Sequence, residues 1–210
     1  LVIMVFSAFA TGGIVIVSQY YGRGEKEHSR LSCGQLITLM EAFSLIILAA
    51  FLLFARPMLS AVFGKVADDV MDAAVIYLVL TSISYPFLAV YNSGAAIFRS
   101  FGNSKISMKI SFVMNLINVL FNAIFVFIFN MGVAGVGLAT LISRVFAAVV
   151  MWCFMNSDRN MLRIQSVREY MPKMEYISRI LKIGVPSGIE NGMFQIGKLL
   201  VVSMVATLGT

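Results

Sequence analysis

Residues 110–157 read ISFVMNLINVLFNAIFVFIFNMGVAGVGLATLISRVFAAVVMWCFMNS, and Arg144 is the only charged residue among them. A helix needs about 20 mostly apolar residues to cross a bilayer, because the hydrocarbon core is about 30 Å thick and a helix rises about 1.5 Å per residue. The stretch is long enough to cross twice, and Asn130-Met131-Gly132 near its middle is a turn signal. We therefore predict two transmembrane helices, over residues 107–129 and 132–155.

The rest of the chain divides by the same rule. Charged residues separate four further apolar runs, which predict transmembrane helices over residues 1–20, 31–55, 73–98 and 178–208. Of the 210 residues, 60% are hydrophobic and 12% are charged, whereas a soluble domain has about 45–50% and about 25%. The runs do not alternate as the strands of a transmembrane barrel do. The expected fold is all-α, a polytopic membrane helix bundle with about six transmembrane helices.

Lysine and arginine gather in alternate connections between these runs. The connections at residues 23–30, 99–109 and 158–182 hold twelve of the 16 basic residues, and those at 56–72 and around Asn130 hold two. Basic connections stay on the cytoplasmic side of a membrane. The net charge of +6 is thus mostly a topology signal, and we expect no nucleic-acid partner.

The one long connection, residues 158–177, carries apolar residues at helical spacing between its charges. We interpret it as an amphipathic cytoplasmic connector at the depth of the lipid headgroups, interrupted near Pro172. A plain linker is the alternative. The residues that define the spacing are Ile164, Val167, Met171, Met174 and Ile177.

One predicted helix carries a polar stripe. Ser111, Asn115, Asn118 and Asn122 are separated by four, three and four residues, which places them on one helix face. Polar groups within a membrane face other helices or water, so the stripe is typical of a polar cavity or an ion path. Hydrogen bonding between helices is the alternative.

The last predicted helix carries a second polar group. Its members lie within an arc of roughly 140° at about 100° per residue, and they are Glu190, Asn191, Gln195 and Lys198. A carboxylate inside a membrane is a candidate functional group, although pairing with a charge on another helix is also compatible. Gly188 and Gly192, beside this arc, would let another helix approach closely.

Glu41 and Arg144 are the other two charges inside predicted helices. Each lies at a similar depth from opposite membrane faces, so we expect a structural salt bridge between them.

The chain shows no nucleotide-binding loop, metal cluster or nucleophile triad, and no enzyme activity is expected. The only histidine, His28, lies in a charged connection and is expected to be solvated. Glycines 132, 135 and 137 are expected to serve close helix packing.

Four stretches, in this order, resemble motifs of the multidrug and toxic compound extrusion (MATE) family. Thr11 to Gly22 (TGGIVIVSQYYG) is similar to the end of the family's second helix. Phe98 to Lys105 (FRSFGNSK) resembles the loop after helix four, although Asn103 and Ser107 stand where the family usually has Asp and Pro. Residues 118–143 resemble helices five and six, and Gly184 to Gly188 (GVPSG) resembles the start of helix seven.

The resemblance implies helices two to seven of a twelve-helix antiporter with two six-helix lobes. Residues 1–157 would belong to the amino-terminal lobe without its first helix, and residues 158–177 would connect the lobes. Residues 178–210 would form the first helix of the carboxy-terminal lobe, most of which would lie outside this chain.

The resemblance also implies a cation site. In the family, an acidic residue on helix one, an Asn and an Asp on helix five and a Thr on helix six form it. Asn118 matches the Asn, Thr140 matches the Thr, and Asn122 stands where many members have Asp. Some members carry a functional Glu on helix seven at the position of Phe194, about one turn beyond Glu190.

The implied function is secondary active efflux of organic or cationic drug-like compounds, coupled to Na⁺ or H⁺, through the cell membrane of a prokaryote. The expected cation ligands are Asn118, Asn122 and Thr140, and the residues expected to contact substrate or a proton are Glu190, Gln195, Asn191 and Lys198. No cofactor is expected, and the full-length protein is expected to be a monomer among membrane lipids. The alternatives are a lipid-linked saccharide flippase of the same superfamily, a membrane-embedded enzyme and a non-transporting subunit.

Overall fold

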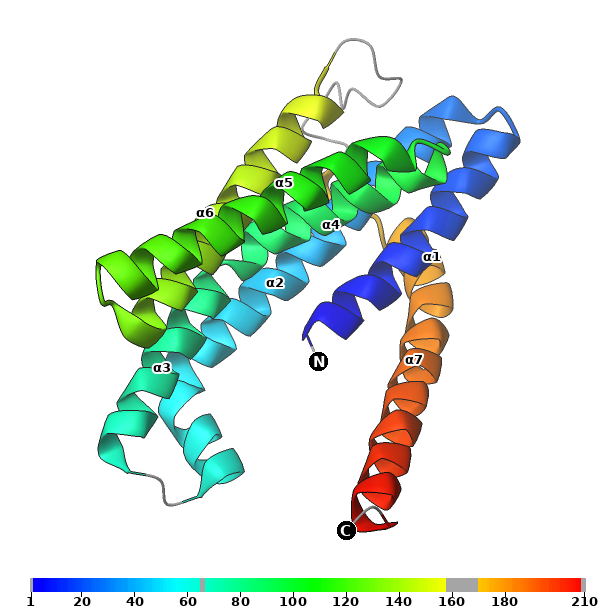
Figure 1. The fold of residues 1–210 in the computed structure, drawn as a ribbon. Helices are drawn as coiled ribbons and strands as arrows, with labels where there is room; N and C mark the ends of the chain where they lie inside the picture. The colour runs from blue at the N-terminus through cyan, green and yellow to red at the C-terminus, as the bar shows by residue number, and fades with distance from the viewer. Residues whose placement is uncertain (1, 65–66, 158–169, 209–210) are drawn as a thin grey trace.

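A computed structural model describes residues 2–64, 67–157 and 170–208, and all regular elements of this part are helices (Figure 1). The elements are α1 (Val2–Gly22), α2 (Lys26–Phe63), α3 (Asp68–Ile83), α4 (Tyr85–Ser100), α5 (Ser104–Ala123), the π-helical turn η1 (Ile124–Ile128), α6 (Gly132–Met155) and α7 (Met174–Leu208). The all-α prediction is confirmed, and every predicted transmembrane segment falls on these helices.

The membrane-spanning elements are close to those predicted. Within the described residues, α1, α2, α5 with η1, and α6 are long and apolar enough to cross a membrane, and α3 with α4 forms one further candidate, bent by 41°. The sixth predicted span, residues 178–208, falls on α7, which is continuous but is not among these candidates. The described residues therefore support four to five spans by length and composition, one or two fewer than predicted.

The connections are shorter than their charges predicted. α2 begins at Lys26 and α5 begins at Ser104, inside the connections expected over 23–30 and 99–109. Long basic side chains at a helix end reach the headgroups while their backbone stays helical. A charge therefore marks the membrane boundary better than it marks the end of a helix. Of the long connector, residues 158–169 lie outside the described residues, and 171–173 are not helical, as Pro172 predicts.

Two helices are distorted at prolines. α2 kinks at Phe54, whose φ of −119° and ψ of 19° are not helical, three residues before Pro57. Proline has no N–H to donate to the preceding turn, which opens the helix there. The α3–α4 bend lies at Ser84, and Pro86 occupies the first turn of α4. One predicted span, residues 73–98, is thus built from two helices.

The expected salt bridge between Glu41 and Arg144 is wrong. Arg144 donates to Ser84 Oγ at the α3–α4 bend and lies over the Tyr85 ring, 5.9 Å from its centroid. Glu41 accepts a hydrogen bond from Ser44 Oγ one turn away, at 3.4 Å. Equal depth brings two charges together only when their helix faces also point at each other, and here α6 turns its arginine toward α3 and α4.

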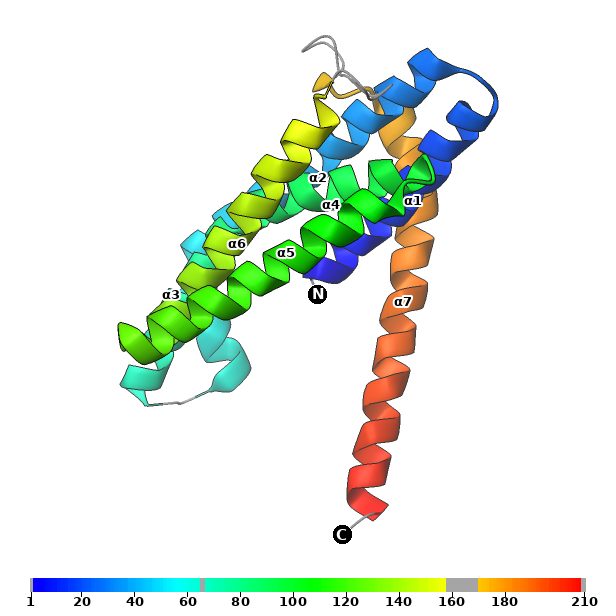
Figure 2. The ribbon, with the colours of Figure 1, turned by 45° about the horizontal axis from the view of Figure 1, so that its top comes forward.

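α4 lies at the centre of the bundle, in contact with α1, α2, α5 and α6 (Figure 1). α7 lies against α1 and touches α2, and its carboxy-terminal part stands clear of the other helices in both views (Figure 2). Fully buried side chains from five helices form the core, among them Phe6, Leu36, Met40, Phe98, Met151 and Ile180. Exposed apolar side chains such as Leu53, Phe112 and Val149 suit a lipid surrounding.

α5 and α6 form the predicted hairpin. The π-helical turn η1 ends α5, and Asn130 and Gly132 take positive φ angles of 51° and 55° in the turn that follows. Asparagine and glycine tolerate this region better than other residues. The turn predicted at Asn130-Met131-Gly132 is therefore confirmed, and it returns the chain along the polar face of α5.

Candidate functional site

The asparagines of α5 contact polar residues of α6. Asn118 Nδ2 lies 3.4 Å from both Thr140 Oγ1 and Ser143 Oγ, and Asn122 Nδ2 donates to Asn118 Oδ1 at 3.0 Å. We call Asn118, Asn122, Thr140 and Ser143 the amide–hydroxyl cluster. The structure thus brings together the three residues that the sequence proposed as cation ligands.

The backbone of α6 orients the two hydroxyl groups of the cluster. Thr140 Oγ1 donates to Val136 O and Ser143 Oγ donates to Thr140 O, each at 2.9 Å. Because both hydroxyl protons are used within α6, the oxygen lone pairs remain for a donor or a cation from outside that helix. Ser143 belongs to the cluster but was not among the predicted cation ligands. Its spacing of three residues from Thr140, which places both on one face of α6, could have identified it.

Close packing of α6 at its amino-terminal end holds the hairpin in place. A Cβ on Gly135 would lie 2.9 Å from Phe125 Cβ, and one on Gly137 would lie 2.9 Å from two atoms of Leu80. Gly135 and Gly137 therefore serve close helix packing, as predicted, whereas the same prediction for Gly132 is wrong, because a Cβ there would meet nothing within 4 Å. The cluster lies one to two turns further along α6.

One oxygen of the cluster has no partner. Asn122 Oδ1 is buried and accepts no hydrogen bond from any described residue. An unsatisfied buried polar atom costs about 1–3 kcal/mol, so native proteins rarely keep one without a reason. The cluster thus contains an amide oxygen without a described partner and two hydroxyl oxygens, and neutral oxygens of these kinds bind hard cations. Within the described residues, no group of His, Cys, Asp and Glu side chains could hold a metal ion.

The second group of predicted site residues is separate from the cluster. Glu190, Asn191, Gln195 and Lys198 are all exposed on α7, which contacts only α1 and α2 among the described helices. Asn191 Nδ2 donates to Ser187 O of its own helix at 2.9 Å, and Lys198 Nζ lies 4.6 Å from the centroid of the Phe194 ring. The structure therefore does not bring these residues to the amide–hydroxyl cluster.

Of the two glycines beside that group, Gly188 and Gly192, only Gly188 is packed closely against another described helix. A Cβ on Gly188 would lie 2.9 Å from Ala8 Cβ, whereas one on Gly192 would meet nothing within 4 Å. Helix α7 is thus packed against α1 at Gly188 and is open at Gly192, within the described chain.

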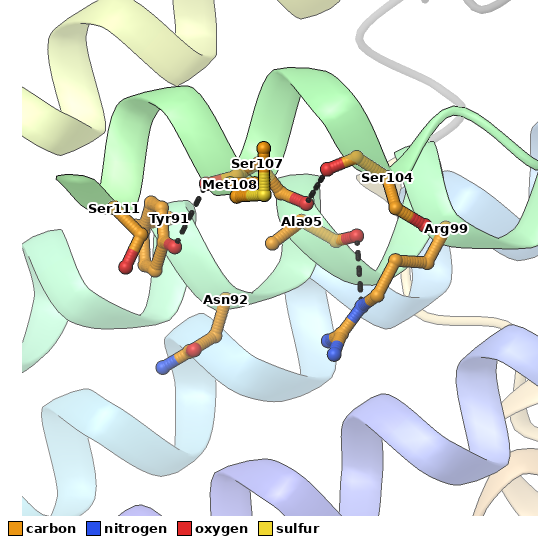
Figure 3. Close-up of a pocket in the computed structure, with 8 residues that line it drawn as sticks. All are labelled: Tyr91, Asn92, Ala95, Arg99, Ser104, Ser107, Met108 and Ser111. Carbon is orange, nitrogen blue, oxygen red and sulfur yellow. Dashed lines mark hydrogen bonds between the residues drawn. The ribbon is translucent and has the colours of Figure 1, made fainter.

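A polar cavity lies at the other end of α5 (Figure 3). It has a volume of about 290 Å³ and lies between α4 and α5. Ser107 Oγ donates to Ser104 O at 3.0 Å, Tyr91 OH lies 3.4 Å from Ser107 O, and Arg99 Nε donates to Ala95 O. The lining residues are Tyr91, Asn92, Ala95, Arg99, Ser104, Ser107, Met108 and Ser111.

The cavity extends the polar stripe of α5. Ser104, Ser107 and Ser111 continue the three- and four-residue spacing of Asn115, Asn118 and Asn122 toward the start of the helix. The polar face therefore runs along the whole of α5, from the cavity to the cluster. The predicted stripe began at Ser111, although the same spacing identifies the two earlier serines, Ser104 and Ser107.

Known proteins resemble this chain along its whole length. The family model described as MatE matches residues 1–124. An uncharacterized transporter of Bacillus subtilis, YisQ, is 30% identical over 214 residues, which cover 100% of this chain and 46% of that protein. A probable multidrug resistance protein of the same organism, YpnP, is 24% identical over 196 residues, covering 93% of this chain and 43% of that protein.

Solved structures share the fold. A crystal structure of MATE in complex with MaD3S superposes with a TM-score of 0.89 at 19% identity, covering 98% of this chain and 46% of the other. The chain therefore spans less than half the length of the proteins that it matches, and it has the architecture of that part of them.

Proposed function

This chain belongs to the MatE family, and on that premise we propose that its parent protein exports organic, cationic or amphipathic compounds by alternating access, driven by Na⁺ or H⁺. Export through the cytoplasmic membrane of a prokaryote is the setting that the multi-pass fold and the bacterial relatives support. The name of YpnP, a probable multidrug resistance protein, supports a drug-like substrate. Members of this family are transporters and not enzymes, which agrees with the expectation of no enzyme activity.

The observation that carries the proposal is the unpartnered Asn122 Oδ1. It lies in a cluster of neutral oxygens within two membrane-spanning helices, where an unsatisfied polar atom has no water to bind. A coupling cation bound by Asn122, Thr140 and Ser143 would satisfy that oxygen. We propose Asn118 as the residue that positions Asn122, because its Oδ1 accepts from the Asn122 amide.

The same chemistry favours Na⁺ at this cluster. No amide or hydroxyl of Asn118, Asn122 or Thr140 releases a proton near neutral pH. Neutral oxygens can still coordinate Na⁺, and a single carboxylate from elsewhere in the parent protein would balance its charge. Proton coupling would instead need a titrating group, and Glu190 on α7 is the candidate within this chain.

The open part of α7 is our proposed substrate contact. Glu190, Asn191, Gln195 and Lys198 are exposed on α7, and a Cβ on the neighbouring Gly192 would meet nothing within 4 Å. A mixed acidic, basic and amide surface could bind an organic cation through Glu190 and polar groups of the compound through the amides.

Transport by the full-length protein in vesicles, under a Na⁺ gradient or a pH gradient applied separately, tests the assignment. We expect Asn122→Leu to lower Na⁺-driven export about tenfold or more, because charge-assisted contacts to the cation are lost. Asn115→Leu is the matched control, since Asn115 is exposed on the same helix face about two turns away. If Asn122→Leu leaves Na⁺-driven export intact and Glu190→Gln abolishes it, the coupling belongs to α7.

Deletion of the parent gene tests the function itself. We expect energised cells without it to retain more of several chemically distinct cationic dyes than cells that carry it. Equal retention of all the dyes would contradict drug export whatever the cluster binds.

Orientation is tested by labelling single cysteines at exposed sites. Glu27→Cys and Asn103→Cys should react with an impermeant thiol reagent only from the cytoplasmic side, and Asp69→Cys only from outside, because of the basic bias of the connections. Reaction of Glu27→Cys from outside would reverse the topology. Ser29, in the same connection, is unsuitable because it is buried.

A further inference from the structure

The cytoplasmic end of α7 is joined to α1 and α2 by a cluster of aromatic and charged residues. His28 Nδ1 lies 2.7 Å from Tyr176 OH, and Arg179 donates to Tyr20 OH. The His28 ring is stacked with both tyrosine rings, at centroid distances of 5.4 Å to Tyr20 and 6.3 Å to Tyr176. Tyr20 and Tyr176 are buried, whereas His28 and Arg179 are exposed at the rim. The only histidine is therefore a contact residue between helices and not simply solvated.

Tyr176 of this cluster keeps a neutral hydroxyl group. Burial raises the pKa of the Tyr176 hydroxyl, and the nearby Tyr20 and Glu175 raise it further, against an opposing effect of Arg179. A neutral hydroxyl can donate its proton to His28 Nδ1 when that nitrogen is unprotonated. The bond thus places a neutral hydroxyl against an imidazole nitrogen at the rim of the contact.

The segment just before α7 is attached in a different way. Gln35 Nε2 donates to Met171 O at 2.8 Å, and Lys173 N donates to Gln35 Oε1 at 2.6 Å. Thr38 Oγ1 bonds to Tyr170 O at 2.9 Å. Gln35 is fully buried, so releasing this segment would cost its buried side-chain amide these two bonds. These bonds tether the segment firmly to α2.

The backbones of α1 and α7 come very close together where the two helices cross, at Gly12 and Gly184. A Cβ on Gly12 would lie 2.9 Å from Gly184 N, and one on Gly184 would lie 2.8 Å from Ala8 O. Small residues at a crossing leave no interlocked side chains, so two helices can change their angle there at low cost. Toward its carboxy terminus α7 separates from α1 (Figure 2), and a Cβ on Gly192 would meet nothing within 4 Å. The pair is thus closed at the end that bears Tyr20 and Tyr176 and open at the other.

We propose that Tyr20, His28, Tyr176 and Arg179 form a latch that closes the cytoplasmic side of the transporter, with the Gly12–Gly184 crossing as its pivot. This inference rests on the proposed function, because alternating access requires the two lobes to part on the cytoplasmic side in one state. When the cytoplasmic side opens, the His28–Tyr176 and Arg179–Tyr20 bonds break, since water can replace the partners of the exposed His28 and Arg179. The Gln35 tether stays closed, since Gln35 itself is fully buried.

The latch is tested with a reporter cysteine in the full-length protein, with Cys33 and Cys153 replaced by serine. Ile16→Cys lies one turn from Tyr20 on α1 and is 6% exposed, so it reacts with a thiol reagent added from the cytoplasmic side only when the latch opens. We expect Tyr176→Phe together with Arg179→Gln to raise its labelling rate about fivefold or more, because two bonds across the latch are lost. Tyr176→Phe alone should give a smaller rise.

Two controls separate opening from other effects. Glu175→Gln removes an exposed ion pair within α7, Arg179 Nη2 to Glu175 Oε1 at 2.8 Å, and should leave the labelling rate unchanged. A second reporter, Ala89→Cys in the core of α4, is fully buried and should stay unreactive in every variant unless the protein unfolds.

Labelling needs no substrate, so its outcome is independent of drug export. Unchanged labelling of Ile16→Cys in both latch variants would overturn the latch even if export is observed. Equal rises in the latch variants and in Glu175→Gln would overturn it as well, since a general loosening by charge removal would then suffice. A rise confined to the latch variants, in a protein that exports no dye, would uphold the latch and contradict the proposed function.

Discussion

The α1–α7 crossing is closed by glycine and backbone contacts, whereas the α5–α6 hairpin meets through amides and hydroxyls. At the crossing, a Cβ on Gly12 would overlap Ile180 O and would lie 2.9 Å from Gly184 N. In the hairpin, the interhelical bonds of Asn118 are 3.4 Å long, and Asn122 Oδ1 has no partner among the described residues.

The difference separates packing from binding within one membrane bundle. A contact built from small residues is already complete, and any added atom disturbs it. A contact with an unsatisfied oxygen is incomplete, and a bound group can complete it. We therefore expect substitutions at the first contact to affect stability, and those at the second to affect function more than stability.

The largest effect on stability is expected from Gly12→Val. Its side chain would force apart the backbones of α1 and α7, at a cost of about 3 kcal/mol. The midpoint of thermal unfolding of the full-length protein in detergent should fall accordingly. Gly22→Val is the control, because a Cβ on Gly22 meets nothing within 4 Å. Equal midpoints for the two variants would mean that the crossing is not tightly packed.

A smaller loss of stability is expected from Asn118→Leu. Asn122 would lose the acceptor of its Nδ2 group and its whole amide would then be unsatisfied, at a cost of about 1–3 kcal/mol. Asn122→Leu should cost less, because it removes one unsatisfied oxygen while creating another on Asn118. The same unfolding assay compares the two, and a greater loss in Asn122→Leu would show that its oxygen has a partner.

The smallest effect is expected from Ser143→Ala. Asn118 Nδ2 keeps Thr140 Oγ1 as an acceptor at 3.4 Å, so the loss of stability should be about 0.5 kcal/mol. Na⁺-driven export should fall more clearly than the unfolding midpoint does, because a cation ligand is lost. An unfolding midpoint that falls as far as in Asn118→Leu would make Ser143 a structural residue and remove it from the proposed site.

The sequence predicted the helices and the polar stripe because both follow from local periodicity. Asn118 and Asn122 are one turn apart, and the turn at Asn130 brings α6 back along α5, so the approach of Thr140 follows from a short hairpin. The role of these residues as ligands came from the resemblance and stays a prediction. The start and end of each helix were less predictable, since charges near Lys26 and Ser104 mark the membrane surface.

Contacts between distant segments left no local signal. The His28–Tyr176 bond joins residues 148 positions apart, and the Gln35 tether depends on how α7 docks on the bundle. The salt bridge expected between Glu41 and Arg144 failed for a related reason. Depth along a helix can be counted from its ends, whereas the direction in which a face points depends on the packing of every neighbour.

The distance in sequence between Gly12 and Gly184 has a consequence for biosynthesis. A ribosome adds about 5–20 residues per second, so α7 is made roughly 10–30 s after α1. During that interval the glycine face of α1 is in the membrane without its partner, where small residues attract any helix that can approach closely. Slower translation between the two segments would lengthen this exposure, and an insertion chaperone that covers α1 would shorten it.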